Sequence, residues 1–276
     1  MRAFFVLTAA VTFASTLGAN GALAQDDPAQ AAREWLADCR DNDRGDLERF
    51  CEVRELAWRV SGRTLTVDGG TNGGVAVHGL NRDSVHVVAK IQAQARTESA
   101  ARELAQGITI EAGDVLRADG PSGTWTRRQG WSVSFEVWAP VRSDLDLEAH
   151  NGGVAVADVT GRMTLRTTNG PLSLRRVAGD VHGQATNGPL VIALEGARWE
   201  GPGLDVETTN GPVDLTLPAG YSAHLETGTV NGPMRIDFPV TVQGRINFRR
   251  IATDIGSGGA TIRAVTTNGP VTIRRR

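Results

Sequence analysis

The amino-acid sequence predicts an all-β fold: a β-solenoid or β-helix-like stack of coils built from short strands. Two observations carry this prediction. An Asn-Gly turn followed by Pro or Gly occurs seven times in the 276 residues, and apolar residues alternate with polar ones around these copies. The copies with Pro are residues 168–171, 186–189, 209–212, 230–233 and 267–270, and those with Gly are 71–74 and 150–153.

The proline distinguishes a bend from a hairpin. Asn-Gly between apolar strands commonly forms a two-residue hairpin with a type I′ turn, which would give an up-and-down antiparallel sheet. In such a turn the residue after Gly donates its backbone N–H, and Pro has none. The Pro copies are therefore predicted to be bends between two strands of one coil. Gly is expected to supply an unusual dihedral angle there, and Pro to fix the exit direction.

Side-chain parity predicts what lies inside each coil. Apolar side chains precede the repeated Asn by six and four residues, as in Met163 and Leu165, and follow it by three and five, as in Leu172 and Leu174. With a strand period of two these residues share one face, and the Asn has the same parity. Stacking would bury this face and place the asparagines in an inward hydrogen-bonded ladder. The predicted ladder consists of Asn151, Asn169, Asn187, Asn210, Asn231 and Asn268.

Residues 1–24 have the features of a secretory signal peptide. Arg2 precedes a short apolar run, and residues 22–24 form an Ala-x-Ala cleavage site, so the mature chain is predicted to begin at Gln25. A membrane anchor is the alternative, but the apolar run is short and interrupted by Thr and Ser. We expect an exported, soluble mature chain without a transmembrane segment, located in the periplasm or at the cell surface.

Residues 25–57 are predicted to be a helical segment that caps the first edge of the stack, with a docking element as the alternative. Asp27 followed by Pro28 is typical of a helix start. The two cysteines, Cys39 and Cys51, are expected to form a disulfide, as is usual in exported proteins. Zinc is the other interpretation, but two thiols without a nearby His or second Cys pair make a poor tetrahedral set.

Residues 58–276 are predicted to form the β-solenoid domain. The interval 73–150 is expected to elaborate the repeat sheet with one short inserted helix, which begins after Thr97 and stops at Gly107. A degenerate coil is expected around residues 240–248. The chain ends in three arginines, which we interpret as charges that protect the last strand edge from pairing, with a basic binding tail as the alternative.

Composition argues against several classes of function. The formal net charge is −2, and it becomes −3 once the leader with its single arginine is removed, which gives no electrostatic reason to expect nucleic acid as a partner. The five histidines form no i, i+4 pair and none lies beside a cysteine. The sequence also has no phosphate loop, dinucleotide fingerprint or nucleophile elbow. No metal and no cofactor are therefore expected.

The outward positions of successive coils raise the question of catalysis. They are Asp146, Glu148, Arg166, His182, Gln184, Asp205, Glu207 and Arg263. A polysaccharide hydrolase or lyase would place paired carboxylates on such a face, and Asp205 and Glu207 share one strand face. We favour a solvated face with weak cross-strand ion pairs. Trp125 and Trp199, in Gly-rich loops, are candidates for stacking on sugar rings, although Trp more often packs in a core or at an edge.

The repeated Thr-Asn-Gly-Pro-[Leu/Val]-x-[Leu/Ile] coils, the Cys-bearing lead and the Gly-rich turn before the last coil resemble the DUF4097 putative-adhesin family. The head domains of autotransporter adhesins are similar. The resemblance covers about residues 58–276. It implies a β-solenoid on the bacterial cell envelope and supplies no catalytic residues.

Three hypotheses of function follow. The first is an exported, non-enzymatic β-solenoid protein with a structural or adhesive role at the bacterial cell envelope, whose partner is an envelope protein or a glycan. The second is a polysaccharide-active β-helix enzyme, and the third an envelope-stress accessory that binds another protein. We favour the first, because the sequence has no motif that requires catalysis.

Overall fold

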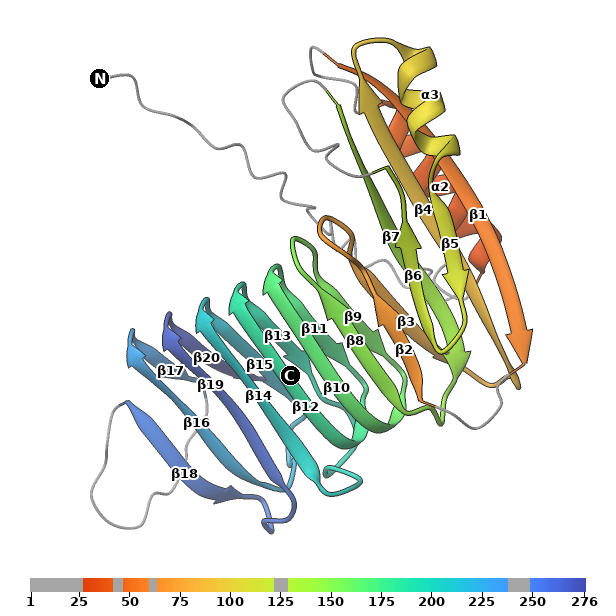
Figure 1. Cartoon of the computed structure of the whole chain (residues 1–276). Coiled ribbons are helices and arrows are strands. Elements are labelled where there is room, and N and C mark those ends of the chain that lie inside the picture. Colours follow the sequence, from red (N-terminus) through yellow and green to blue (C-terminus); the bar gives the residue numbers. More distant parts are fainter. Residues whose placement is uncertain (1–26, 42–46, 60–63, 122–128, 238–248) are drawn as a thin grey trace, which may run out of the picture.

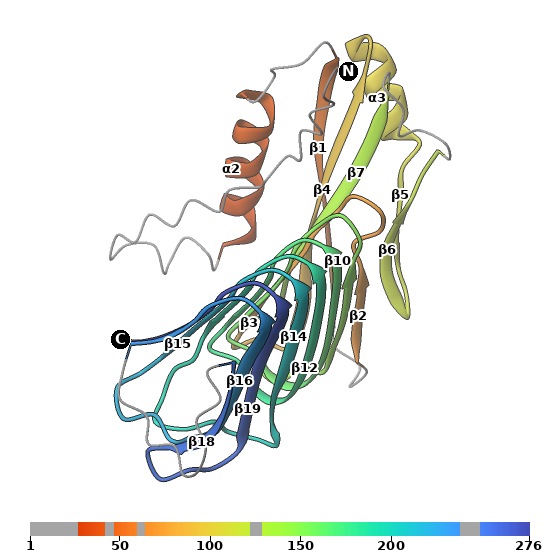
Figure 2. The same ribbon diagram turned by 90° about the vertical axis from the view of Figure 1, so that its left-hand side faces the viewer.

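The computed structural model describes residues 27–41, 47–59, 64–121, 129–237 and 249–276. Within these ranges the chain forms two ten-stranded mixed sheets, here called sheet A and sheet B, with most of the apolar core between them. Figures 1 and 2 show a row of short-strand coils next to a group of longer strands that carries two helices. The fold is therefore all-β in its main part, as predicted. The leader, residues 1–24, lies outside the described residues.

Sheet A contains, in spatial order, β1 (Glu48–Arg59), β4 (Ser84–Ala95), β7 (Gly130–Pro140), β3 (Val75–Leu80), β9 (Val154–Ala157), β11 (Leu172–Arg175), β13 (Leu190–Ala193), β15 (Val213–Leu217), β20 (Val271–Arg275) and β17 (Met234–Ile236). Sheet B contains β18 (Arg250–Ile255), β16 (Ala223–Asn231), β19 (Thr261–Asn268), β14 (Gly203–Asn210), β12 (Ala178–Asn187), β10 (Thr160–Asn169), β8 (Leu145–Ala149), β2 (Leu65–Asp68), β6 (Val115–Asp119) and β5 (Thr109–Ala112). The helices are α2 (Pro28–Asp41) and α3 (Glu98–Gln106).

Each Asn-Gly-Pro segment joins a strand of sheet B to a strand of sheet A. β10 and β11, for example, flank one copy, yet β10 pairs with β12 and β11 pairs with β13, both in parallel. The two strands around the motif thus belong to different sheets, which confirms the bend and excludes the hairpin. Equivalent residues of successive coils are direct partners, as Asn169 and Asn187 are.

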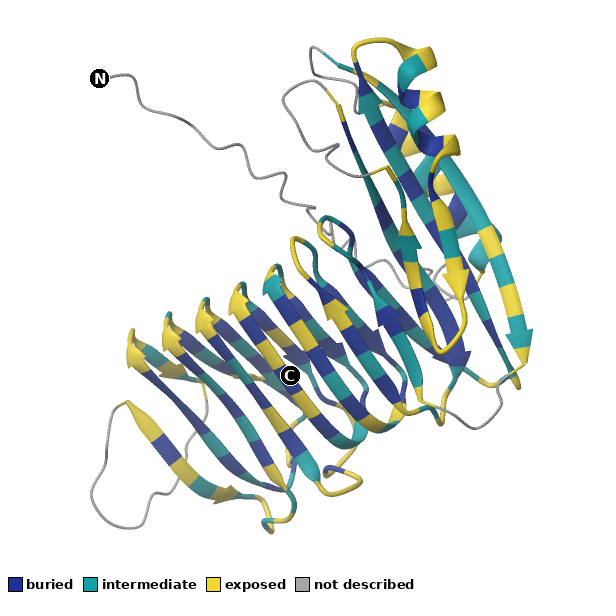
Figure 3. Cartoon of the chain, viewed as in Figure 1, coloured by how far each residue is buried: buried dark blue, intermediate teal, exposed yellow. Residues whose placement is uncertain are grey.

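The alternation of side chains follows from this stacking. Met163, Leu165, Leu172 and Leu174 all point into the space between the sheets and are at most 1% exposed. Figure 3 shows the resulting alternation of buried and exposed residues along the strands of the coils. Each fully buried Leu contributes roughly 1.5–3 kcal/mol relative to an exposed one, so one coil gains its stability from its neighbours.

In four of the coils a buried threonine stands two residues before the repeated Asn and bonds to the neighbouring coil. The Thr167 hydroxyl donates to the Gly152 carbonyl oxygen at 2.7 Å, and Thr208 donates to Gly188 at 2.9 Å. The same bond recurs at Thr229 and Thr266. These hydroxyls are at most 4% exposed, and the bond removes the cost of burying them unpaired.

The repeated asparagines are joined side chain to side chain. Each Nδ2 donates to the Oδ1 of the Asn in the neighbouring coil at 2.7–3.0 Å, in the order Asn231, Asn268, Asn210, Asn187, Asn169, Asn151 and Asn72. All six asparagines of the predicted ladder are exposed, however, so the expected inward orientation is wrong. Strand alternation ends at the buried Thr, and the chain has begun to bend where the Asn stands.

Close approach of the coils explains the glycine of the motif. A Cβ on Gly188 would lie 1.9 Å from the Gly170 carbonyl oxygen, and one on Gly170 would lie 2.2 Å from that of Gly152. Neither glycine has a positive φ. The expectation that Gly supplies an unusual dihedral angle is therefore wrong at these bends. The absence of a side chain is what matters, because the neighbouring backbone occupies its place.

The N-terminal end of sheet A differs from the prediction in one respect. α2 begins at Pro28, where Asp27 Oδ1 accepts from the Ala29 N–H at 2.9 Å, but the helix ends at Asp41 and β1 starts at Glu48. Residues 48–57 were expected within a helical segment and are a strand, which runs across the boundary expected at residue 57. All twelve residues of β1 pair with the apolar-rich β4, which extends the sheet and outweighs local helical propensity.

Two helices flank this end of sheet A. α2 packs through Ala32 on the outer face, and α3 packs through Ala101 and Ala105 on the inner side (Figure 2). The Thr97 hydroxyl caps α3 by accepting from the Ala100 N–H, as predicted. The predicted disulfide between Cys39 and Cys51 is confirmed and links α2 to β1. Neither helix is long and apolar enough to span a bilayer, as judged over the described ranges.

The C-terminal coil does not lie at the end of the stack. β19 pairs with β14 on one side and β16 on the other, and β20 lies between β15 and β17. The last coil of the chain is thus inserted between two earlier ones. The terminal arginines therefore do not protect an edge strand, and that interpretation is wrong. The Arg276 side chain instead donates to Glu195 Oε1 at 2.8 Å. The degenerate coil expected at residues 240–248 lies outside the described residues.

Replacement of Asn187 by alanine tests the exposed ladder. Asn187 makes two amide–amide bonds, so Asn187→Ala should lower the free energy of unfolding by about 1–2 kcal/mol. Chemical denaturation measures this difference, with Asn81→Ala, outside the repeats, as the control. Equal stability of the Asn187 variant and the parent would show that the ladder contributes nothing.

Replacement of Gly188 by alanine tests the close approach. The added methyl group would overlap the Gly170 carbonyl oxygen, so Gly188→Ala should destabilise the protein by more than about 3 kcal/mol or prevent folding. Gly113→Ala is the matched control, because a Cβ there meets no atom within 4 Å. Thermal unfolding followed by circular dichroism gives the comparison, and similar melting temperatures for the two variants would contradict the steric account.

Candidate functional site on the outer face of sheet B

The outward residues predicted from the sequence lie together on the solvent-facing side of sheet B, here called the sheet B face. In-register pairing arranges them in rows that run across the strands. One row is His182, Asp205, Arg263 and Glu226, and the next is Gln184, Glu207, Val265 and Gly228. The parity prediction located these positions correctly, but it did not reveal which coils are neighbours.

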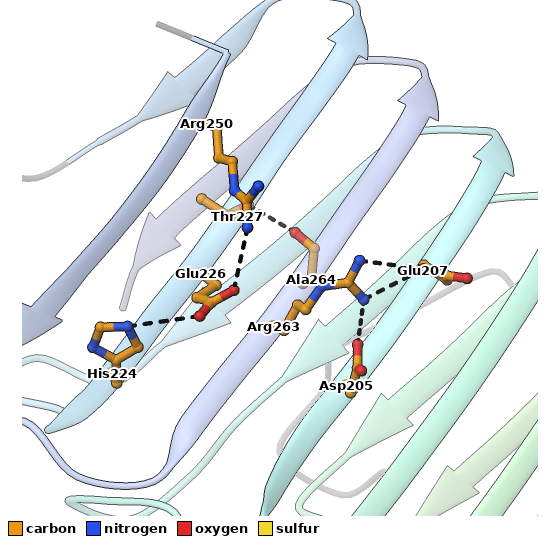
Figure 4. Close-up of polar contacts among 8 residues, drawn as sticks. All are labelled: Asp205, Glu207, His224, Glu226, Thr227, Arg250, Arg263 and Ala264. Carbon is orange, nitrogen blue, oxygen red and sulfur yellow. Dashed lines mark hydrogen bonds and ion pairs between the residues drawn. The ribbon is translucent and has the colours of Figure 1, made fainter. Parts of the chain in front are cut away.

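Arg263 holds the two carboxylates that were candidates for acid–base chemistry (Figure 4). Its Nη1 bonds to Asp205 Oδ1, and its Nη1 and Nη2 both lie 3.3 Å from Glu207 Oε2. β19 brings Arg263 beside β14 only because the C-terminal coil is inserted there. Burial lowers the pKa of Arg263, but hydrogen bonds and charges from Asp205 and Glu207 outweigh burial and raise it.

A second polar group lies at the end of the same face, where β16 meets β18. Glu226 is 3.8 Å from Arg250 Nη2 and 3.8 Å from His224 Nε2, while His224 Nδ1 is 2.7 Å from Asp254 Oδ1. Thr227 points inward instead and donates to the Ala264 carbonyl oxygen at 2.8 Å (Figure 4). Each acid in this group thus faces a basic side chain.

These rows line a shallow groove of about 660 Å³ that crosses β12, β14, β19 and β16. Its lining includes Thr186, Thr209 and Thr267, and beside β16 it includes Arg249 and Arg250. Residue 249 is held to β16, because the Thr229 N–H donates to the Arg249 carbonyl oxygen at 2.9 Å. A smaller hollow of about 220 Å³ continues the groove towards β10 and shares Gln184 and Glu207 with it.

This geometry favours binding over acid–base catalysis. A general acid and a general base need to exchange protons with substrate, whereas Asp205 and Glu207 both bond to the one guanidinium group of Arg263. The groove supplies hydroxyl, amide and carboxylate groups at its surface. Such groups can hold a polar ligand without reacting with it.

A separate charged cluster lies on the outer face of sheet A. Glu136 bonds to Lys90 Nζ at 2.5 Å and to His78 Nε2 at 3.1 Å, and the His78 ring stacks on Trp138 at a centroid distance of 5.5 Å. Burial raises the pKa of Glu136, but the bonds to His78 and Lys90 outweigh it and lower the pKa to about 2. No sequence pattern predicts this cluster, because its members come from three strands and belong to no motif.

The tryptophans and histidines offer no further site in the part of the chain that is described. Trp199 is buried and its indole N–H donates to the Gly179 carbonyl oxygen at 2.9 Å, so the favoured interpretation of core packing is confirmed and the alternative of stacking on sugars is wrong. Trp125 lies outside the described residues. His150 and His182 are exposed, as expected. Among the described residues no group of three or more His, Cys, Asp or Glu side chains is placed to hold a metal ion.

Comparisons with known proteins give only distant structural likenesses. No known family and no curated protein sequence matches the chain. A putative cell adhesion protein from Clostridium sporogenes ATCC 15579 has a TM-score of 0.40 and 11% identity, covering 82% of this chain and 100% of the other. A putative adhesin from Bacteroides fragilis NCTC 9343 has a TM-score of 0.29 and 13% identity, over 82% and 97%. A putative adhesin from Parabacteroides merdae ATCC 43184 has a TM-score of 0.31 and 9% identity, covering 81% of this chain and 96% of the other.

The low pKa of Glu136 predicts an acid-dependent loss of stability. Its folded pKa of about 2 lies below the ordinary 4.5, so its contribution is fully present above pH 4.5 and is lost as the pH falls towards 2. The contribution is on the order of 3 kcal/mol. Glu136→Gln should therefore be less stable than the parent at neutral pH, and the difference should shrink between about pH 4.5 and 2. Denaturation at several pH values measures it, and a difference independent of pH would contradict the assignment.

Proposed function

We propose that this protein is an exported, non-enzymatic β-solenoid protein of the bacterial cell envelope with a structural or adhesive role. In this proposal the sheet B face contacts the partner, which is an envelope glycan or protein. The observation that carries it is the pair of contacts made by Arg263. Arg263 binds both Asp205 and Glu207 and so leaves a groove suited to holding a ligand.

The solenoid architecture is supported by the regularity of the coils. Equivalent residues of successive coils pair in parallel and in register in both sheets. The buried threonine bonds and the exposed asparagine ladder repeat from coil to coil in the same way. Rigid, repeated surfaces of this type are commonly used for binding extended partners.

Export is supported by two independent features. The disulfide between Cys39 and Cys51 is of a kind that persists in oxidising compartments outside the cytosol. The first 24 residues also have the charge, apolar run and cleavage site of a secretory leader. The resemblance of the coils to DUF4097 proteins supports the envelope as the destination.

Retention on isolated cell envelopes tests the proposed function. The purified protein should sediment with envelope fractions, and Thr209→Arg, which fills the groove with a long side chain, should weaken retention about tenfold. Ser173→Arg is the matched control, because Ser173 faces outward on β11 of the opposite sheet. Equal retention of Thr209→Arg and the parent would exclude the groove as the contact surface.

Assays on a panel of polysaccharides complete this test. We expect no hydrolysis and no elimination by the parent protein. Turnover that is abolished by Asp205→Ala or by Glu207→Ala would overturn the non-enzymatic assignment and favour a polysaccharide-active enzyme.

A further inference from the structure

We propose that the groove on the sheet B face binds a neutral, linear glycan that runs along the stacking axis, with one sugar ring over each coil. This inference rests on the proposed function, in which the same face contacts the partner. It adds the chemical class of the ligand and its direction across the strands.

The first argument is the spacing of equivalent groups. Asn187, Asn210 and Asn268 are direct partners in neighbouring strands, so the preceding residues Thr186, Thr209 and Thr267 stand in line. Neighbouring strands lie about 4.8 Å apart, and the hydroxyls repeat at that interval. A pyranose ring linked at opposite ends advances a linear chain by a similar length. A linear glycan can therefore present the same hydroxyl to each coil in turn.

The second argument is the kind of group that the face offers. β12, β14 and β19 each pair with a strand on both sides, so their backbone N–H and C=O groups are already used. An extended peptide would find no backbone partners on this face and would leave its own unsatisfied. A glycan has no such requirement. Its hydroxyls can bond to the Thr hydroxyls and to the Gln184 amide, which also contacts Glu207 at 3.1 Å.

The third argument is charge. Asp205 and Glu207 are paired with Arg263, and Glu226 faces Arg250 and His224. The charged residues that line the groove are Glu207, Glu226, Arg249, Arg250 and Arg263, so charges of both signs are mixed along it and give little attraction for a polyanion or a polycation. Paired carboxylates and guanidinium groups retain lone pairs and N–H groups that can bond to sugar hydroxyls. The groove therefore suits a neutral ligand rich in hydroxyls.

The groove also provides an apolar contact and a defined length. Val265 lies in the row between Glu207 and Gly228, where the C–H face of a sugar ring can pack against it. The groove crosses four strands, which corresponds to roughly four sugar rings at the strand spacing. Arg249 and Arg250 line it beside β16. At the other end it continues into the hollow towards β10, where a longer chain would extend.

Calorimetric titration with neutral linear oligosaccharides of two to six sugars tests the proposal. Affinity should rise with chain length up to about four rings and then level off, because each ring adds contacts with one coil. Oligosaccharides of the same length that carry uronates should bind no more tightly, and added salt should have little effect. The double variant Thr209→Val and Thr267→Val should bind about tenfold more weakly, since it loses two hydroxyl contacts and keeps the side-chain shape.

The matched control is the double variant Thr216→Val and Thr272→Val, which removes two hydroxyls from the outer face of sheet A. It should bind like the parent, and melting temperatures establish that both double variants fold.

Absence of length-dependent binding, tighter and salt-sensitive binding of uronates, or unchanged affinity of the Thr209/Thr267 variant would each overturn the proposal. If no oligosaccharide binds while Thr209→Arg still prevents envelope retention, the glycan assignment fails and the contact surface stands. If Thr209→Arg has no effect either, both fail.

Discussion

The whole array depends on how closely two coils approach each other at the Asn-Gly bend. A carbonyl oxygen of one coil occupies the space where a Cβ of Gly188 or Gly170 would lie in the next, so only glycine permits the contact. That approach places the Thr208 hydroxyl within bonding distance of the Gly188 carbonyl oxygen, and the Asn187 amide within bonding distance of the Asn169 amide. It also sets the in-register pairing from which the core and the rows on the sheet B face follow.

Sequence reasoning predicted the parts of this fold that depend on local chemistry. Proline at residue 189 removes a donor and so excludes the hairpin turn, and the two-residue period identifies buried positions such as Leu165. Parity failed at Asn187 because alternation holds only while the strand stays extended, and the bend begins just before it. The helical prediction was wrong at residues 48–57, where pairing with β4 makes the segment a strand.

The candidate site was predicted only in part, for a topological reason. Local parity placed Asp205, Glu207 and Arg263 on an outer face, and the structure has them there. The contacts of Arg263 with Asp205 and Glu207, however, require Arg263 to lie beside β14. Fifty residues of sequence separate β14 from β19, the strand that carries Arg263. No local pattern reports an insertion of that kind. The cluster of Glu136, Lys90 and His78 was missed for the same reason.

The insertion of the C-terminal coil also constrains how the protein can be made. β19 and β20 follow β16 and β17 in the chain, yet they separate them from β14 and β15. The array therefore cannot grow one coil at a time behind the emerging chain. β16 (Ala223–Asn231) and β17 (Met234–Ile236) lie beside this inserted coil, and β16 otherwise pairs with β18. A chain that ends before Thr261 therefore lacks the coil that joins β16 and β17 to β14 and β15.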